Sequence, residues 1–260
     1  MVGINSIVEE TPDAVAERVA RDFETLVHET LATQSRMTIA LAGGQTPKIF
    51  YSRLALEPFK SSIPWEKLWF FWGDERCVAP DHPDSNFRMV SEALLSQVPV
   101  NPSHVFRMHG EEAPPQAARD YEKILRDTFP DREWAGFDLI LLGLGPDGHT
   151  ASLMPSTPAL SMSGAANDRW VVGNVIRAMQ TVRITLTLPS INHARNIWFL
   201  VTGAKKASVY ARAQEAENAD CPASLVHPVQ GNLRWYIDKA VAGTASPELT
   251  PLILRQNQKQ

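Results

Sequence analysis

The stretch FDLILLGLGPDGHTAS, residues 137–152, decides the fold class because it joins a buried strand to a glycine-rich turn. Residues 137–144 are almost entirely apolar, which is typical of a strand covered on both faces of a sheet. The segment 143–148 contains three glycines, which give the backbone an unusual path before His149 is presented near a helix start. In open α/β sheets ligands bind at the carboxyl ends of strands, so this turn is a candidate site.

Apolar strands and amphipathic helices alternate along the rest of the chain. The remaining strands are predicted at 37–42, 68–72, 171–176, 182–188, 197–202 and 233–238. Helices are predicted from Thr11-Pro12 to Leu31, from Thr46-Pro47 onward, at about 85–97, 114–129 and 204–217, and near Ala223. This alternation predicts βαβ units and the α/β class, with a mainly parallel sheet and helices on both faces.

The sequence shows no internal boundary. No linker rich in glycine and serine divides it, so we expect one domain over residues 1–260 with a core of about 10–240. The polar segment 155–169 is interpreted as a surface loop, and the tail after Thr244 as loosely ordered. Residues 1–11 have no long apolar run and 139–144 is too short to span a bilayer, so we expect neither a signal peptide nor a membrane segment.

Composition narrows the class of ligand. Of the 260 residues, 44% are hydrophobic and 21% charged, as in ordinary globular proteins. The net charge is −4, so the chain lacks the basic excess of a nucleic-acid binder and no nucleic-acid partner is expected. An anionic ligand must therefore be held by a few local cations and backbone dipoles. The two cysteines, Cys77 and Cys221, are interpreted as reduced thiols of a cytoplasmic protein, because their spacing indicates neither a disulfide framework nor a zinc site.

Two further strand ends carry unusual residues. The turn Gly43-Gly44-Gln45-Thr46-Pro47 leaves backbone N–H groups free at a helix start, which suits a phosphate, although a plain tight turn with an N-cap is the alternative. After the apolar strand LWFFW come Gly73, Asp74, Glu75 and Arg76. Arg76 could bind phosphate in a bidentate manner, and an acid could orient a base or bind sugar hydroxyls. The alternative for this loop is a surface salt-bridge cluster.

The most reactive candidate is His149. Its ordinary pKa near 6.5 suits proton transfer at neutral pH, and Asp147 lies two residues away. No second ligand lies at helical spacing from His149, so the prediction is a catalytic residue and no metal site. Arg183 in a strand and Lys205-Lys206 at a helix start add cations. Two lysines at a helix start are unfavourable because they oppose the helix dipole, so they indicate an anion bound nearby. The alternative interpretation is a solvated lysine pair without a ligand.

Together these segments resemble the 6-phosphogluconolactonases, in the broader group that includes glucosamine-6-phosphate deaminases. The matching segments are LAGGQTP (41–47), WGDERCV (72–78), SNFRM (85–89), LLGLGPDGHTASLMP (141–155), RITLTLPSINHA (183–194), VTGAKKA (201–207) and CPASLVHP (221–228). They cover about residues 37–238. The resemblance implies a Rossmann-like sheet, no cofactor and no metal, and hydrolysis of 6-phospho-D-glucono-1,5-lactone to 6-phospho-D-gluconate, the second step of the oxidative pentose phosphate pathway.

The resemblance also implies roles for individual residues. His149 resembles the general base, and Asp74 resembles a residue that lines the pocket. We predict that Asp147 orients His149. The substrate and phosphate set comprises Gly43, Gly44, Gln45, Thr46, Arg76, Arg183 and Lys206. The choices between Arg177 and Arg183, and between Lys205 and Lys206, stay open. Cys77 has no functional interpretation, and a monomer or a small homo-oligomer is expected.

Two other functions are weighed. A deaminase-type isomerase resembles this chain except that the deaminase segment DGHIAFNEP has a glutamate before its proline, where this chain has Met154. The missing carboxylate weakens that alternative and does not affect lactone hydrolysis. A non-catalytic sugar-phosphate sensor is the other alternative. Sensors of this fold usually carry an added DNA-binding segment, and residues 1–34 are acidic with one predicted helix.

Overall fold

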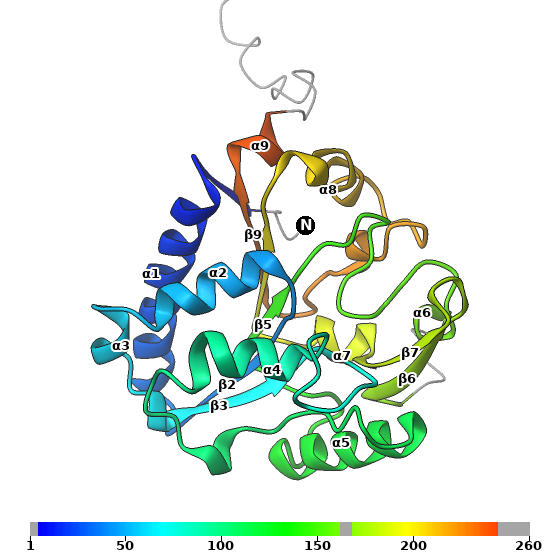
Figure 1. Cartoon of the computed structure of the whole chain (residues 1–260), viewed down its shortest axis with the longest axis horizontal. Coiled ribbons are helices and arrows are strands. Elements are labelled where there is room, and N and C mark those ends of the chain that lie inside the picture. Colours follow the sequence, from blue (N-terminus) through cyan, green and yellow to red (C-terminus); the bar gives the residue numbers. More distant parts are fainter. Residues whose placement is uncertain (1–4, 162–167, 244–260) are drawn as a thin grey trace, which may run out of the picture.

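The computed structural model describes residues 5–161 and 168–243, and it is built around a six-stranded parallel sheet (Figure 1). The strands follow the order β1-β9-β8-β5-β2-β3, and every neighbouring pair is parallel. They are β1 Asn5–Glu9, β2 Met37–Leu41, β3 Leu68–Trp72, β5 Leu139–Leu142, β8 Asn196–Val201 and β9 Asn232–Asp238. The α/β class and the mainly parallel sheet are confirmed.

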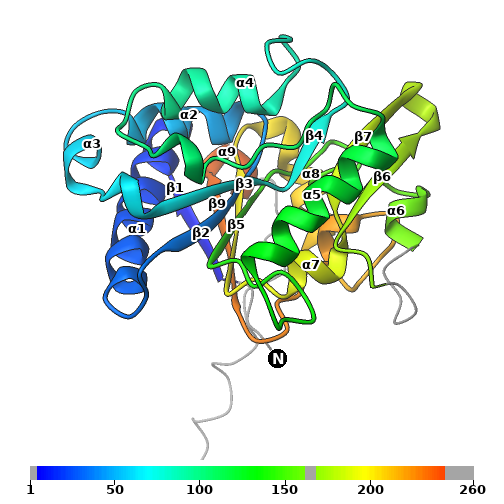
Figure 2. The same cartoon turned by 90° about the horizontal axis from the view of Figure 1, so that it is seen from below.

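Helices cover both faces of this sheet, as predicted (Figure 2). Figure 2 shows α1 and α2 on one side of the parallel strands and α5 and α7 on the other. The bounds are α1 Pro12–Leu31, α2 Gln45–Leu54, α3 Phe59–Ser62, α4 Asn86–Val90, α5 Pro114–Thr128, α6 Pro158–Ser161, α7 Leu188–Asn192, α8 Ala207–Ala213 and α9 Lys239–Ala242. None of the helices within 5–161 and 168–243 has both the length and the apolar run needed to cross a membrane.

Helix α1 begins where its sequence predicts. The Thr11 side chain accepts a hydrogen bond from the Ala14 N–H at 3.2 Å, and Pro12 occupies the first turn, where it needs no hydrogen-bond donor. Val15, Val19 and the other apolar residues at helical spacing are buried against the sheet. The strand β3 is buried at four of its five positions, which explains why such an apolar run lies inside the sheet.

A second sheet corrects one part of the prediction. The strands predicted at 171–176 and 182–188 exist as β6 Val171–Ile176 and β7 Thr181–Leu186, but they pair antiparallel and lie outside the parallel sheet. Their third partner is β4 Asp74–Arg76, which pairs antiparallel with β7. Charged residues gave no signal for β4, because its strand conformation depends on pairing with a distant segment.

Some element bounds also differ from the prediction. The helix expected over 204–217 is a short 3-10 turn at Ala204–Lys206 followed by α8, which ends at Ala213. The helix expected over 85–97 is α4 followed by a π-helical turn at Ser91–Leu95. The 155–169 loop contains α6, and the expected loose tail after Thr244 lies outside the described residues. Neither cysteine forms a disulfide, and Cys221 is buried.

Candidate active site

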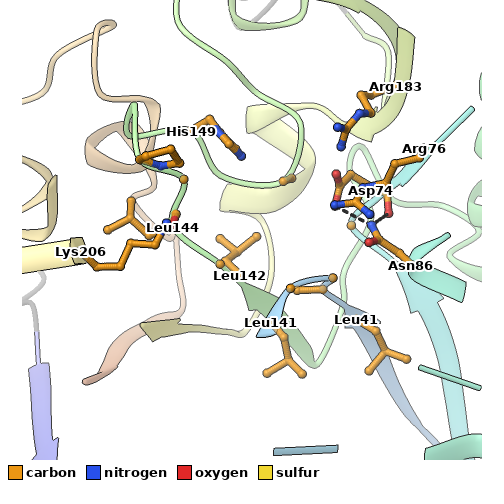
Figure 3. Close-up of a pocket in the computed structure, with 18 residues that line it drawn as sticks. Leu41, Asp74, Arg76, Asn86, Leu141, Leu142, Leu144, His149, Arg183 and Lys206 are labelled. Carbon is orange, nitrogen blue, oxygen red and sulfur yellow. Dashed lines mark hydrogen bonds between the residues drawn. The ribbon is translucent and has the colours of Figure 1, made fainter. Parts of the chain in front are cut away.

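A pocket of about 240 Å³ opens at the carboxyl ends of β2, β3 and β5 (Figure 3). Parallel strands place their carboxyl ends at one edge of the sheet, so segments far apart in sequence meet there. Figure 3 shows His149 and Lys206 on one side of the pocket and Asp74, Asn86, Arg76 and Arg183 on the other. The other residues that line it are Leu41, Ala42, Gly43, Gly44, Gly73, Leu141, Leu142, Gly143, Leu144, Gly145, Pro146 and Ala151.

The turn after β5 holds His149 in a fixed orientation. Asp147 Oδ1 accepts hydrogen bonds from the His149 backbone N–H at 3.1 Å and pairs with His149 Nδ1 at 2.5 Å. Asp147 thus holds the ring at one nitrogen, and the His149 side chain is 26% exposed, so the ring still reaches solvent from the pocket. Burial by itself would raise the pKa of Asp147, but the adjacent His149 imidazole and backbone N–H outweigh it and lower this pKa, which keeps the carboxylate ionised at neutral pH. The pair is arranged as an oriented base.

Gly145 is required for that orientation, because its α-carbon faces the imidazole. A Cβ atom at this position would lie 2.1 Å from His149 Nδ1. We predict that Gly145→Ala lowers kcat about 10- to 100-fold by displacing the ring, since small misplacements of a catalytic group are costly. Steady-state kinetics together with a thermal melt tests this. A kcat equal to that of the unchanged chain would contradict the close contact.

Asp74 forms a buried polar network on the opposite side of the pocket. Its Oδ2 accepts a hydrogen bond from Ser152 Oγ at 2.5 Å, and Asn86 Nδ2 donates to its backbone carbonyl at 2.9 Å. The Asn86 carboxamide also lies directly against Gly43. Asn86 and Ser152 were not predicted as site residues, because their contacts with Asp74 join segments 12 and 78 positions apart. The available signals were the position of Asn86 after the charged loop and the presence of both residues in segments that resemble the family.

Glu75 lies outside the pocket and supports it from behind. Its carboxylate is 2% exposed and accepts hydrogen bonds from the backbone N–H groups of Arg76, Asn86 and Phe87 and from the Ser85 hydroxyl. Burial raises the pKa of Glu75, and the three backbone N–H groups partly offset that rise. The carboxylate therefore fastens β4 to the start of α4, which places Asp74 and Asn86 side by side.

Removing this carboxylate should destabilise the fold. We predict that Glu75→Ala lowers the free energy of unfolding by about 2–4 kcal/mol, because several buried N–H groups lose their acceptor. Urea denaturation measures the change. Glu112→Ala removes an exposed glutamate and serves as the control, with an expected change within about 0.5 kcal/mol. Equal effects of the two substitutions would refute the role given to Glu75.

Two arginines face each other across the β4–β7 pair. Arg76 and Arg183 are register partners, and the Nε atom of each is buried without a hydrogen-bond partner among the described residues. Burial lowers the pKa of Arg183, and the positive charge of Arg76 lowers it further. Like charges directly opposite each other are unfavourable in a sheet. Their position at the pocket wall is therefore suited to an anion that would bind both guanidinium groups.

Lys206 adds a cation near His149. Its Nζ donates a hydrogen bond to the Leu144 carbonyl at 2.7 Å, and burial lowers its pKa while Asp147 acts in the opposite direction. Lys205 is exposed and absent from the lining. Arg177 is likewise exposed and borders a different cavity, so Arg183 and Lys206 are the members of each pair that line the pocket.

The glycine turn before α2 is only partly in the pocket. Gly43 and Gly44 line it, and Gly44 is the N-cap of α2 without a side-chain cap. Gln45 is exposed and does not line it, and the Thr46 hydroxyl is hydrogen-bonded to Thr202 Oγ1 at 2.8 Å. The turn can therefore offer backbone groups to an anion, whereas the roles predicted for the Gln45 and Thr46 side chains stay predictions.

Comparisons with known proteins agree with this site. A family model described as glucosamine-6-phosphate isomerases/6-phosphogluconolactonase matches residues 10–235. The chain belongs to this family. A protein named 6-phosphogluconolactonase from Synechocystis sp. is 42% identical over 237 residues, which cover 89% of this chain and 94% of that relative. A second protein of the same name, from Nostoc sp., is 38% identical over 248 residues, which cover 92% and 98%.

Solved structures share this fold. The 6-phosphogluconolactonase from Trypanosoma brucei has a TM-score of 0.83 at 29% identity, covering 95% of this chain and all of that one. A monomeric glucosamine-6-phosphate deaminase has a TM-score of 0.76 at 21% identity, covering 92% and 99%, and shares the fold alone.

Within residues 5–161 and 168–243, no group of three or more His, Cys, Asp or Glu side chains could hold a metal ion in this family member. Metal-free chemistry stays a prediction.

Proposed function

We propose that the chain hydrolyses 6-phospho-D-glucono-1,5-lactone to 6-phospho-D-gluconate, with His149 as the general base. The observation that carries the proposal is one pocket that brings together an oriented imidazole and three cations. His149 is held by Asp147, and Arg76, Arg183 and Lys206 line the same cavity. Membership of the family and 42% identity to a named 6-phosphogluconolactonase support the choice of substrate.

The base acts through the nitrogen that Asp147 leaves free. Because Nδ1 pairs with the Asp147 carboxylate, its proton stays there and Nε2 is the unprotonated nitrogen. Nε2 takes a proton from water, the resulting hydroxide attacks C1, and a tetrahedral oxyanion forms. On its collapse the bond from C1 to the ring oxygen breaks, and that oxygen takes the proton from Nε2. The products are the open-chain hydroxyl group and a carboxylic acid, which ionises.

Arg76, Arg183 and Lys206 bind the phosphate of the substrate, and the imidazole acts at C1. A phosphate dianion has three oxygens that can accept charge-assisted hydrogen bonds from guanidinium and ammonium groups. Contacts far from C1 supply the binding energy that places this carbon near the attacking water. Asp74 is held rigid by Ser152 and Asn86 and can bind sugar hydroxyls. No metal or cofactor enters these steps.

Lactone hydrolysis is favoured over amino-sugar chemistry by the position of Met154. This residue stands where the resembling deaminase segment has a glutamate, and it borders the neighbouring cavity and not the His149 pocket. The chain thus places no carboxylate at that position to assist ring opening. We further propose that it acts as one domain in the cytoplasm, as a monomer or small homo-oligomer, without a nucleic-acid partner.

A coupled assay tests the proposal. Freshly made 6-phosphogluconolactone is supplied with a dehydrogenase that consumes 6-phosphogluconate, and cofactor reduction is compared with the spontaneous rate. The expected result is rapid turnover of the lactone and no ammonia from glucosamine 6-phosphate. Ammonia release, or stabilisation by 6-phosphogluconate without any lactone turnover, would replace the proposal with the deaminase or the sensor.

A further inference from the structure

The segment 218–225, which contains most of the CPASLVHP motif, is not explained by contact with the pocket, because none of its residues lines that cavity. It lies instead against the back of the turn that carries His149. The Ala223 N–H donates to the Gly148 carbonyl at 2.9 Å, and the buried Cys221 packs against Gly148. Figure 1 shows α8 and the loop after it beside the loop that follows β5.

Contact at Gly148 is close enough to restrict the turn. Gly148 has φ +93°, a backbone conformation that residues with a side chain rarely adopt. A Cβ atom there would lie 2.7 Å from Cys221 Sγ and 3.1 Å from an Arg212 side-chain nitrogen. The turn is therefore enclosed on the side facing away from the pocket, and its position depends on the residues that touch it.

Arg212 at the end of α8 joins the two segments. Its Nη2 donates to the Asp147 carbonyl at 2.9 Å and to the Asp220 carbonyl at 3.4 Å. Segment 218–225 is itself closed by a hydrogen bond from the Asn218 N–H to Ser224 Oγ at 2.9 Å, so it presents a fixed surface. Asp147 is thus bound at both ends: its carboxylate by His149 and its backbone carbonyl by Arg212.

We propose that Arg212 is a positioning residue that, together with segment 218–225, holds Asp147 against His149. The inference rests on the proposed function for its kinetic consequence. The Asp147 side chain is 46% exposed, so the two hydrogen bonds from His149 compete with water. Fixing the Asp147 carbonyl restricts the backbone from which the carboxylate projects, and this keeps the imidazole in its productive orientation.

Two substitutions at Arg212 test the proposal kinetically. Arg212→Met keeps the aliphatic part and removes the donors, and we expect kcat to fall about tenfold with KM changed less than about twofold. Arg212→Lys keeps one donor and should retain more of the wild-type kcat. Arg36→Met is the matched control, because Arg36 Nη2 also donates to a backbone carbonyl, that of Thr128, at the opposite end of the sheet. Its kcat should be unchanged.

A spectroscopic measurement separates positioning from general stability. The proton shared by His149 Nδ1 and Asp147 should give a downfield NMR resonance, assigned by its absence in His149→Asn. This resonance should move or vanish in Arg212→Met and persist in Arg36→Met. A kcat within twofold of wild type, or a lower Tm with an unchanged resonance, would overturn the proposal. The resonance needs no substrate, so it tests Arg212 even if the wild-type chain has no lactonase activity.

Discussion

Replacing His149 with alanine should lower kcat about 10²–10⁴-fold, because the group that removes a proton from water is lost. KM should change only a few fold, since Arg76, Arg183 and Lys206 still line the pocket. The coupled lactone assay measures both constants, provided that the spontaneous rate is subtracted. A lactone is an activated ester and hydrolyses without enzyme, so this correction decides whether residual activity belongs to the protein.

A second histidine provides the control for this substitution. His227 Nε2 lies 3.4 Å from the Glu217 carboxylate, so it forms a histidine–acid pair outside the pocket. His227→Ala should leave kcat and KM unchanged. If His149→Ala kept the wild-type kcat, His149 would not be the base, and the catalytic group would have to be sought among the other residues of the same pocket.

The parallel sheet could be predicted because its strands are buried on both faces. Runs such as LWFFW and LILL contain apolar residues without alternation, which is typical of a strand covered on both faces, and their alternation with amphipathic helices favours a parallel sheet. The antiparallel sheet could not be separated from it, because β6 and β7 also contain apolar residues, and β7 pairs with the distant segment β4 as well as with β6. The strand β1, NSIVE, contains only two apolar residues, Ile7 and Val8, and therefore gives no strand signal.

The pocket was predictable to the extent that it is built from strand ends. His149, Gly43 and Lys206 each follow a parallel strand, so the topology alone brings them to one edge of the sheet. Asn86 follows no strand and reaches the pocket through the hydrogen bonds of Glu75 to the start of α4. The opposition of Arg76 and Arg183 depends on a register between two distant strands, which no local pattern encodes.

That opposition leads to the second large prediction. Arg183→Met should raise KM about 10- to 100-fold, because a charge-assisted contact to the substrate anion is lost, while kcat changes little. The same substitution should raise Tm. Burial and Arg76 both lower the pKa of Arg183, which means that the folded state disfavours its charge, and at neutral pH the side chain remains charged in the folded and unfolded chain. Removing it relieves that cost.

Arg177→Met is the matched control for this experiment. Arg177 lies between β6 and β7, near Arg183 in sequence, but it is exposed and does not line the pocket. Its substitution should leave KM and Tm unchanged. Replacing an arginine that merely supported the sheet would lower Tm and leave KM unchanged. For Arg183→Met we expect a higher Tm and a higher KM. KM and Tm are expected to rise together only if Arg76 and Arg183 repel each other in the folded chain and bind the same anion.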